Sequence, residues 1–190
     1  MLILASTSPY RRELLQRLGL PFQAASPNVD EAPLPLETPL ARAQRLALAK
    51  ATAVHRSHEV ATVIGSDQVA VCKGRVLDKP GDAGRCREQL CWLSGAAATF
   101  YTAVAVLGNR STQLSQTVDT TTVYFRTLGD EEIERYITAE QPFDCAGGFR
   151  AEALGITLFA RIVSEDPTAL IGLPLIALAR SLRQLGYELP

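Results

Sequence analysis

The sequence of 190 residues is poor in histidine and cysteine, which limits the metal sites and nucleophiles it can form. Its two histidines, His55 and His58, lie in one polar stretch with no motif around them, and its four cysteines form no C-x-x-C pair. The sequence therefore argues against a Cys/His zinc site and against a Ser/His/Asp triad. We expect the cysteines to be small apolar core residues that form no disulfides in a reducing compartment.

The chain also lacks an excess of one charge and lacks long apolar runs. Lys plus Arg is 19 and Asp plus Glu is 20, which gives a formal net charge of −1 and argues against a surface built to bind nucleic acid or anionic lipid. No apolar run reaches the ~18 residues that span a bilayer, and no basic region precedes the short apolar stretch at the N-terminus. We expect a folded cytoplasmic protein with no nucleic-acid or membrane partner.

Strand and helix patterns alternate along the chain, without repeats and without Walker A or G-x-G-x-x-G motifs. The segment 21–37 carries four prolines and is expected to be a loop or extended segment. Because the strands near 100 and 120 follow each other directly, the pattern predicts a mixed α/β sheet flanked by helices. We predict strands over 2–5, 60–64, 69–72, 99–107, 118–127 and 156–163, and helices over 8–19, 38–55, 82–93, 130–139 and 172–186.

Two arginines, Arg11 and Arg12, lie in the first turn of the first predicted helix, where cations oppose the helix dipole. The small polar residues Ser6, Thr7 and Ser8 directly precede this helix, after a short strand. A strand, a polar loop, a helix N-terminus and two arginines together favour an anion site, most naturally for phosphate. The alternative is a pair of solvated surface arginines.

The sequence Gly65-Ser66-Asp67-Gln68 interrupts an apolar run from Val60 to Cys72. A carboxylate at the end of a buried strand is costly unless it is paired or used, and ligands of α/β folds bind at such strand ends. Asp67 is therefore a candidate general base or metal ligand. The same four residues would also make a simple turn between two strands.

Other charged residues have positions that suit phosphate or metal binding. Lys50 is the only charge in a stretch of small apolar residues, and Lys79 is held extended by the proline after it. The pair Asp30-Glu31 and the more distant Glu152 could hold Mg²⁺, which favours one or two carboxylates together with substrate phosphates. Taken singly, each of these residues could equally be a solvated surface charge.

Several motifs in one order give the chain a resemblance to a known family, the Maf-like nucleotide pyrophosphatases. The resemblance extends over essentially the full length. The matching motifs are Leu4-Ala5-Ser6-Thr7-Ser8-Pro9-Tyr10-Arg11-Arg12, Val29-Asp30-Glu31, Ala49-Lys50-Ala51, Ile64-Gly65-Ser66-Asp67-Gln68-Val69, Asp78-Lys79-Pro80, Phe100-Tyr101-Thr102 and Cys145-Ala146-Gly147-Gly148-Phe149.

The resemblance implies one domain over 1–190, with an elongated mixed sheet flanked by helices and two lobes around a cleft, similar to the inosine triphosphate pyrophosphatases. It implies hydrolysis of a nucleoside triphosphate to the monophosphate and diphosphate, with Mg²⁺ or Mn²⁺ as cofactor, and a homodimer as an expectation for the family. Asp67 matches the proton acceptor, and Glu31 matches a metal or water ligand that could share the metal with Asp67. The phosphate-binding positions are Ser6, Arg11, Arg12, Lys50 and Lys79.

Three positions separate the substrate classes of this family, and here they are Tyr10, Gln68 and Glu152. They resemble the 7-methyl-GTP branch more than the branch that acts on dTTP and UTP. An aromatic face at residue 10 favours the cationic 7-methylguanine ring, although Trp is expected there and Gly is expected at Ala153. A carboxylate at residue 152 could accept from the guanine N1–H and N2–H₂ edge. The alternatives are a pyrophosphatase for dTTP, UTP or another modified nucleotide, and a non-catalytic regulator of septum formation.

Overall fold

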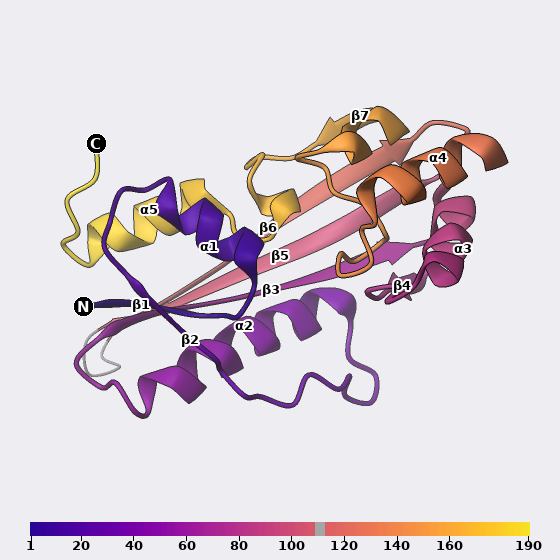
Figure 1. The fold of residues 1–190 in the computed structure, drawn as a ribbon. Coiled ribbons are helices and arrows are strands. Elements are labelled where there is room, and N and C mark those ends of the chain that lie inside the picture. Colours follow the sequence, from indigo (N-terminus) through magenta and orange to yellow (C-terminus); the bar gives the residue numbers. More distant parts are fainter. Residues whose placement is uncertain (109–112) are drawn as a thin grey trace. The chain divides into compact units, whose positions relative to one another are not determined.

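The computed structural model describes residues 1–108 and 113–190 as two compact units (Figure 1). Unit 1 comprises Met1–Gln68, Tyr101–Asp119 and Asp166–Pro190, and unit 2 comprises Val69–Phe100 and Thr120–Glu165. Three strands, β3, β5 and β6, contribute residues to both units. The predicted elongated shape and the predicted cleft concern the arrangement of these two units, and they stay predictions, as does the single domain over 1–190.

In the described part of the chain, seven strands form one mixed sheet in the order β2-β1-β3-β5-β6-β7, with β4 paired to β3. The pairs β1–β2 and β1–β3 are parallel, whereas β3–β4 and β6–β7 are antiparallel. The predicted mixed α/β sheet flanked by helices is confirmed. The strands are β1 (Leu2–Ala5), β2 (Gln23–Ala25), β3 (Thr62–Cys72), β4 (Arg75–Leu77), β5 (Ala97–Leu107), β6 (Leu114–Phe125) and β7 (Phe159–Val163).

Two helices begin where the capping residues of the sequence predict, whereas the last helix begins at Leu175 rather than at residue 172. Ser8 and Thr38 accept from the backbone N–H groups of Arg11 and Ala41, and a proline follows each of them at the first helical position. The helices are α1 (Pro9–Gln16), α2 (Pro39–His55), α3 (Ala83–Leu93), α4 (Asp130–Glu140) and α5 (Leu175–Gln184), with 3₁₀ helices η2 (Leu154–Leu158) and η3 (Ala169–Ile171).

In unit 1, α1 and α5 cover one face of the sheet and α2 covers the other (Figure 1). The face covered by α1 and α5 holds one continuous apolar cluster, drawn from strands, α1 and the C-terminal segment, so that residues far apart in sequence share one core. Its buried members are Leu2, Leu4, Leu14, Leu15, Ile64, Val104, Val106, Leu173, Leu175, Leu178 and Leu182.

In unit 2, α3 packs against α4, and a cluster of four phenylalanines forms part of the core. Neighbouring rings meet edge to face, with centroids 5.1–5.5 Å apart, which is a favourable arrangement of their quadrupoles. The four rings belong to Phe100, Phe125, Phe149 and Phe159.

The predicted interruption of the third strand is wrong, because β3 runs without a break through Gly65, Ser66, Asp67 and Gln68. Each polar side chain in this stretch has a hydrogen-bond partner, so the strand can carry polar residues through a buried layer. Asp67 therefore lies inside a strand, neither at a strand end nor in a turn.

Some boundaries also differ from the prediction. The short strands β2 and β4 lie in segments where no strand was predicted, and residues 156–158 are 3₁₀ helix rather than the start of a strand. A strand of three residues is too short to show periodicity in its sequence, so only its pairing with a neighbouring strand identifies it. Among the described residues, no helix is long and apolar enough to cross a membrane.

Candidate active site

Two carboxylates of unit 1 converge on one buried ammonium group. Lys50 Nζ lies 2.7 Å from Asp67 Oδ1 and 2.7 Å from Glu31 Oε1. The side chains of Lys50 and Asp67 are only 7% and 8% exposed, whereas that of Glu31 is 57% exposed. The structure therefore brings together three residues that the sequence placed in a loop, a helix and an interrupted strand.

A glycine of β3 allows α2 to approach closely enough for this contact. A Cβ atom on Gly65 would lie 2.1 Å from the carbonyl oxygen of Ala47 and 2.6 Å from the amide nitrogen of Ala51. Both are backbone atoms of α2, which cannot move aside as a flexible side chain can. Gly65 thus sets the separation between α2 and β3, and this separation lets Lys50 reach Asp67.

Arg11 is fixed by a backbone carbonyl of the C-terminal segment. Its Nε donates to Gly172 O at 2.9 Å, and within the described parts of the chain its two terminal nitrogens have no hydrogen bond, so they could bind a ligand. Burial lowers the pKa of Arg11, while the carboxylates of Asp67 and Glu31 act in the opposite direction. The guanidinium group of Arg11 is therefore close enough to both carboxylates for an electrostatic interaction with each.

The turn over residues 169–172 supplies three carbonyl oxygens to the neighbouring strands. Gln68 Nε2 donates to the carbonyls of Ala169 and Leu170, and Ser66 Oγ lies 2.9 Å from Gly172 O. Thr102 Oγ1 donates to Ala169 O and lies 3.0 Å from Gln68 Nε2. Sequence reasoning missed this turn, because backbone carbonyls leave no residue-type signal.

The remaining predicted site residues of unit 1 lie in α1 or directly before it. Two of them are more exposed than Lys50 and Asp67, and one is buried. Ser6 is 6% exposed at the end of β1, and its Oγ accepts from the backbone N–H of Ser8. Arg12 is exposed, and Tyr10 is partly buried in the first turn of α1. The first turn thus presents Arg12 to solvent, which agrees both with phosphate binding and with a solvated surface arginine.

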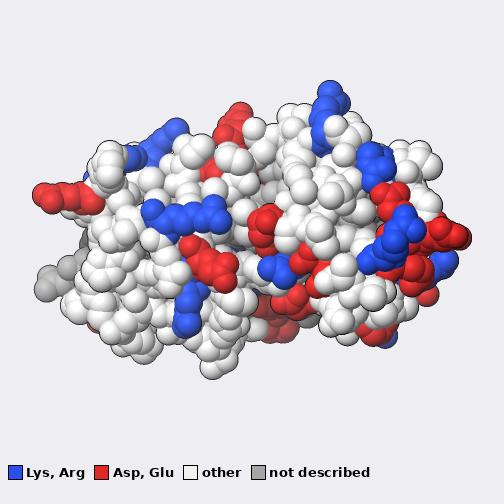
Figure 2. All heavy atoms as spheres, turned by 45° about the horizontal axis from the view of Figure 1, so that its top comes forward, with Lys and Arg blue, Asp and Glu red and all other residues white. Residues whose placement is uncertain are grey.

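In unit 2, Lys79 lines a polar cavity of about 260 Å³. Gln89 also lines the cavity, and its Nε2 donates to Asp78 O. The cavity carries charges of both signs, from Arg75, Asp78, Lys79, Arg85 and Glu88. Basic and acidic side chains are likewise interspersed over the face drawn in Figure 2.

Glu152, also in unit 2, belongs to a chain of three charged groups. Its Oε1 lies 3.6 Å from Arg150 Nε, and Arg150 Nη1 lies 3.1 Å from Glu140 Oε1. The second oxygen of Glu140 accepts from the backbone N–H of Leu154 at 2.9 Å. The last residue of α4 therefore anchors the loop that carries Glu152.

The carboxylates of Glu31 and Asp67 could hold a metal ion only together with further ligands, such as substrate phosphates. Among the described residues, no group of three or more His, Cys, Asp and Glu side chains is placed to hold a metal ion. Glu31 and Asp67 nevertheless bring one carboxylate oxygen each to within 2.7 Å of Lys50 Nζ, so the two carboxylates lie close together beside that ammonium group. Mg²⁺ is commonly bound by one or two carboxylates and substrate phosphates, so the residues present fit this ion.

Comparison with known proteins places the chain in a family. A family model described as "Maf-like protein" matches residues 1–185, so the chain belongs to the Maf family. A relative from Aromatoleum aromaticum named "7-methyl-GTP pyrophosphatase" is 53% identical over 189 residues, 100% of this chain and 97% of the relative. A second relative with the same name, from Xanthomonas campestris pv. campestris (strain 8004), is 56% identical over 189 residues, 100% of this chain and 98% of the relative.

Among solved structures, a HAM1 protein from Coxiella burnetii is similar to this chain. The alignment covers 98% of each chain at 13% sequence identity, with a TM-score of 0.49. Because this TM-score is below 0.5, the fold assignment rests on the sheet topology given above.

Proposed function

We propose that this protein hydrolyses 7-methyl-GTP to 7-methyl-GMP and diphosphate. The observation that carries the proposal is full-length identity above 50% to several proteins named 7-methyl-GTP pyrophosphatase. The Lys50–Asp67–Glu31 group in unit 1 supports it, because the group supplies a carboxylate base, one cationic ligand for a phosphate and a second carboxylate that could help to hold a metal ion.

Asp67 acts as the general base in this proposal. Its Oδ1 is held by Lys50, and Oδ2 is the oxygen that takes a proton from water. The water oxygen then bonds to the α-phosphorus, the bond from that phosphorus to the bridging oxygen breaks, and diphosphate leaves. A base held in one orientation by an ion pair is ready for this transfer without rearrangement.

Cationic side chains bind the triphosphate. The terminal guanidinium nitrogens of Arg11 suit a phosphate oxygen because Nε is already tied to Gly172 O. Arg12 and Ser6 are further ligands from the same end of α1, and Lys50 and Lys79 complete the proposed set. These charges stabilise the negative charge that develops on the departing diphosphate.

Glu31 and Asp67 would hold Mg²⁺ or Mn²⁺ together with phosphate oxygens. When bound, the ion supplies positive charge that neutralises the phosphates and polarises the phosphoryl group. In the absence of the ion, Lys50 keeps the two carboxylates together and so preserves their positions.

Tyr10, Gln68 and Glu152 are the proposed base-selecting residues. The phenol ring of Tyr10 attracts the cationic 7-methylguanine ring, and the carboxylate of Glu152 accepts from the guanine N–H groups. The structure adds that Gln68 Nε2 already donates to Thr102 and to the 169–172 turn. Its contribution to base selection therefore comes through Oε1 or through the position of that turn.

Diphosphate release with Mg²⁺ or Mn²⁺ tests the proposal, with 7-methyl-GTP compared against GTP, dTTP and UTP. We expect the highest kcat/KM for 7-methyl-GTP. Preference for dTTP or UTP would keep the reaction and overturn the substrate assignment. No turnover of any of the four would overturn the assignment and favour another modified nucleotide or a non-catalytic role.

The proposal also covers the setting in which the enzyme works. We place it in the cytoplasm as a nucleotide hydrolase with no nucleic-acid or membrane partner, and we propose a homodimer. On the face drawn in Figure 2, basic and acidic side chains are interspersed, whereas the phosphate backbone of nucleic acids is bound by clustered basic side chains.

A further inference from the structure

The loop that carries Glu31 needs an anchor. Residues 26–38 join β2 to α2 without a strand or a helix, and Glu31 itself is exposed. Irregular segments of this length are uncommon in compact domains unless they have a functional role. Yet the carboxylate of Glu31 lies 2.7 Å from the buried Lys50 Nζ, so some other part of unit 1 must hold the loop in place.

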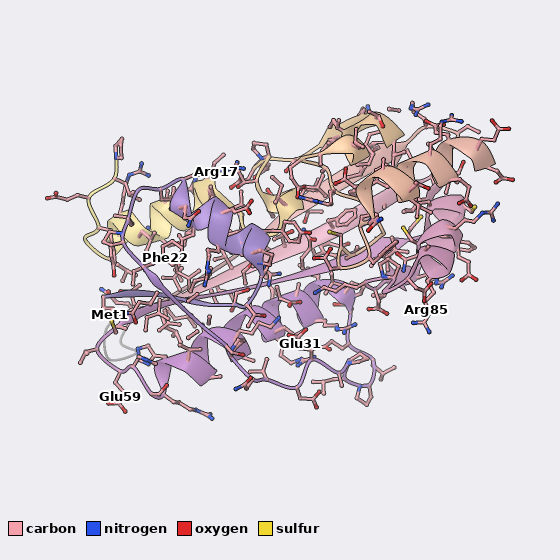
Figure 3. All side chains as sticks on the ribbon, viewed as in Figure 1. Met1, Arg17, Phe22, Glu31, Glu59 and Arg85 are labelled. Atoms are coloured by element: carbon pink, nitrogen blue, oxygen red, sulfur yellow. The ribbon has the colours of Figure 1, made fainter. Side chains whose placement is uncertain are left out.

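Two arginines of α2 bind consecutive carbonyl groups of this loop. Arg42 Nη2 donates to Glu31 O at 3.0 Å, and Arg45 Nη2 donates to Ala32 O at 3.0 Å. Residues three apart on a helix share one face, so both guanidinium groups reach the same stretch of backbone. In Figure 3, Glu31 lies in the loop beside α2, as these hydrogen bonds require.

Arg45 is itself held by a carboxylate at the far end of the loop. Its Nε lies 2.5 Å from Glu37 Oε1 and its Nη2 lies 2.8 Å from Glu37 Oε2, which makes a two-point pair. Glu37 Oε2 also accepts from the backbone N–H of Leu34, and the Glu37 side chain is only 7% exposed. The pair therefore ties the loop at two places, residues 32 and 34–37.

We infer that Arg45, oriented by Glu37, is the positioning residue that holds Glu31 in its metal-binding place, with Arg42 as a second anchor. This inference rests on the proposed function, in which Glu31 and Asp67 bind Mg²⁺ or Mn²⁺. Glu31 would bind the ion directly, whereas Arg45 acts only through the backbone at residue 32. The predicted site residue Glu31 is thus held in place by residues that nothing in the sequence indicated.

Direct Mn²⁺ binding to the substrate-free protein tests the inference, measured by calorimetry or by the EPR signal of unbound Mn²⁺. Arg45→Gln should weaken Mn²⁺ binding at least tenfold, which is the usual effect of losing a partner that orients a metal ligand. Glu37→Gln should weaken binding in the same direction by a smaller factor. Arg45→Lys should be intermediate, because one ammonium group cannot replace the planar fork.

Turnover supplies a second readout. With Arg45→Gln, the Mn²⁺ concentration for half-maximal activity should rise by the same factor as the dissociation constant. The kcat at saturating Mn²⁺ should stay within about twofold of the parent, because excess metal compensates for a badly placed ligand.

Matched controls separate positioning from general loss of stability. Val54→Ala removes buried volume from the same helix and should lower Tm with unchanged Mn²⁺ binding. Arg135→Gln removes an exposed ion pair with Glu131 in α4 and should change neither quantity.

Two results would overturn the inference in different ways. If Glu31→Gln weakens Mn²⁺ binding but Arg45→Gln binds within twofold of the parent, Glu31 is a ligand and Arg45 does not position it. If Glu31→Gln itself leaves Mn²⁺ binding unchanged, the metal role of Glu31 fails together with the inference. Failure to turn over 7-methyl-GTP would instead concern only the substrate, since Mn²⁺ binding is measured without it.

Discussion

Lys50 is a buried cation shared by two carboxylates, and this sharing decides how substitutions at the site act. The ammonium group satisfies Asp67 and Glu31 at equal distances of 2.7 Å. Removing one partner of a buried ion pair leaves the other uncompensated, which costs more than the pair contributes. Substitutions that keep the hydrogen bond and remove only the charge are therefore the informative ones at this site.

Asp67→Asn should lower kcat at least ~10²-fold, because an amide cannot take a proton from water. The amide oxygen can still accept from Lys50 Nζ, so the fold should be retained. Steady-state diphosphate release and a thermal melt of the same preparation check both statements. Turnover near the parental rate would show that Asp67 is not the base.

Glu37 should contribute to stability over a wide pH range. Its hydrogen bond with Arg45 lowers the pKa of the Glu37 carboxyl from 4.5 to about 2. Because the pKa is lower in the folded protein, the contribution is complete above pH 4.5 and is lost as pH falls toward 2. Urea unfolding of the parent and Glu37→Gln should therefore show a stability difference that is constant above pH 4.5 and shrinks below it. A difference that grows on acidification would contradict this assignment.

At the scale of elements, the close contact between α2 and β3 leaves no room for a larger side chain at Gly65. Gly65→Ala should destabilise the protein by about 3 kcal/mol or more, because the new methyl group meets backbone atoms of Ala47 and Ala51. Activity should fall as well, since displacing α2 moves Lys50 away from Asp67. Urea unfolding and kcat measure the two effects.

Gly84→Ala is the matched control for Gly65→Ala. Gly84 lies in α3, and a Cβ there meets only the side chain of Asp82, at 3.4 Å. Alanine is about 1 kcal/mol more favourable than glycine in a helix, so this variant should be neutral or slightly more stable. Equal losses in both glycine variants would contradict the role given to the α2–β3 contact.

The sequence predicts the start of a helix best where residues close together in the sequence determine it. Ser8-Pro9 and Thr38-Pro39 mark the beginnings of α1 and α2 through groups within four residues of each other. The continuity of β3 has no local cause, because Ser66 and Gln68 are satisfied by residues 34–106 positions away. A polar interruption and a polar strand interior look alike until those partners are known.

The site likewise contains residues that their type identifies in the sequence and contacts that the sequence alone does not reveal. Residue type marked Lys50, Asp67 and Glu31, and the structure brings all three together. Gly172 O and the pair Arg45–Glu37 could not be inferred in that way. The first is a backbone atom, and the second resembles any exposed ion pair until its loop contacts are seen.

At the scale of the whole molecule, the two units are interleaved along the chain. Unit 1 is built from three segments, and its last segment, Asp166–Pro190, supplies four buried leucines of the core cluster. Each buried leucine contributes roughly 1.5–3 kcal/mol, so together they contribute about 6–12 kcal/mol. This is comparable with the whole stability of a typical domain. The four are Leu173, Leu175, Leu178 and Leu182.

Truncation after Glu165 should therefore leave unit 1 unfolded. Circular dichroism should show loss of helix beyond that of α5 alone, and Mn²⁺ binding should disappear because β3 and α2 lose their support. A truncated chain in which the remaining residues of unit 1 stay folded, with Mn²⁺ binding intact, would contradict the contribution given to this segment.

Interleaving also fixes an order of assembly on the ribosome. Both segments of unit 2 emerge before Asp166, so unit 2 can finish folding while unit 1 still waits for its third segment. The first 68 residues, which carry Arg11, Glu31, Lys50 and Asp67, must wait in an unfinished state although they are made first. Nascent chains usually complete their N-terminal parts first. The proposed site residues would therefore reach their places only after the helix α5 has been translated, and a chain that terminates before it should not hydrolyse nucleotides.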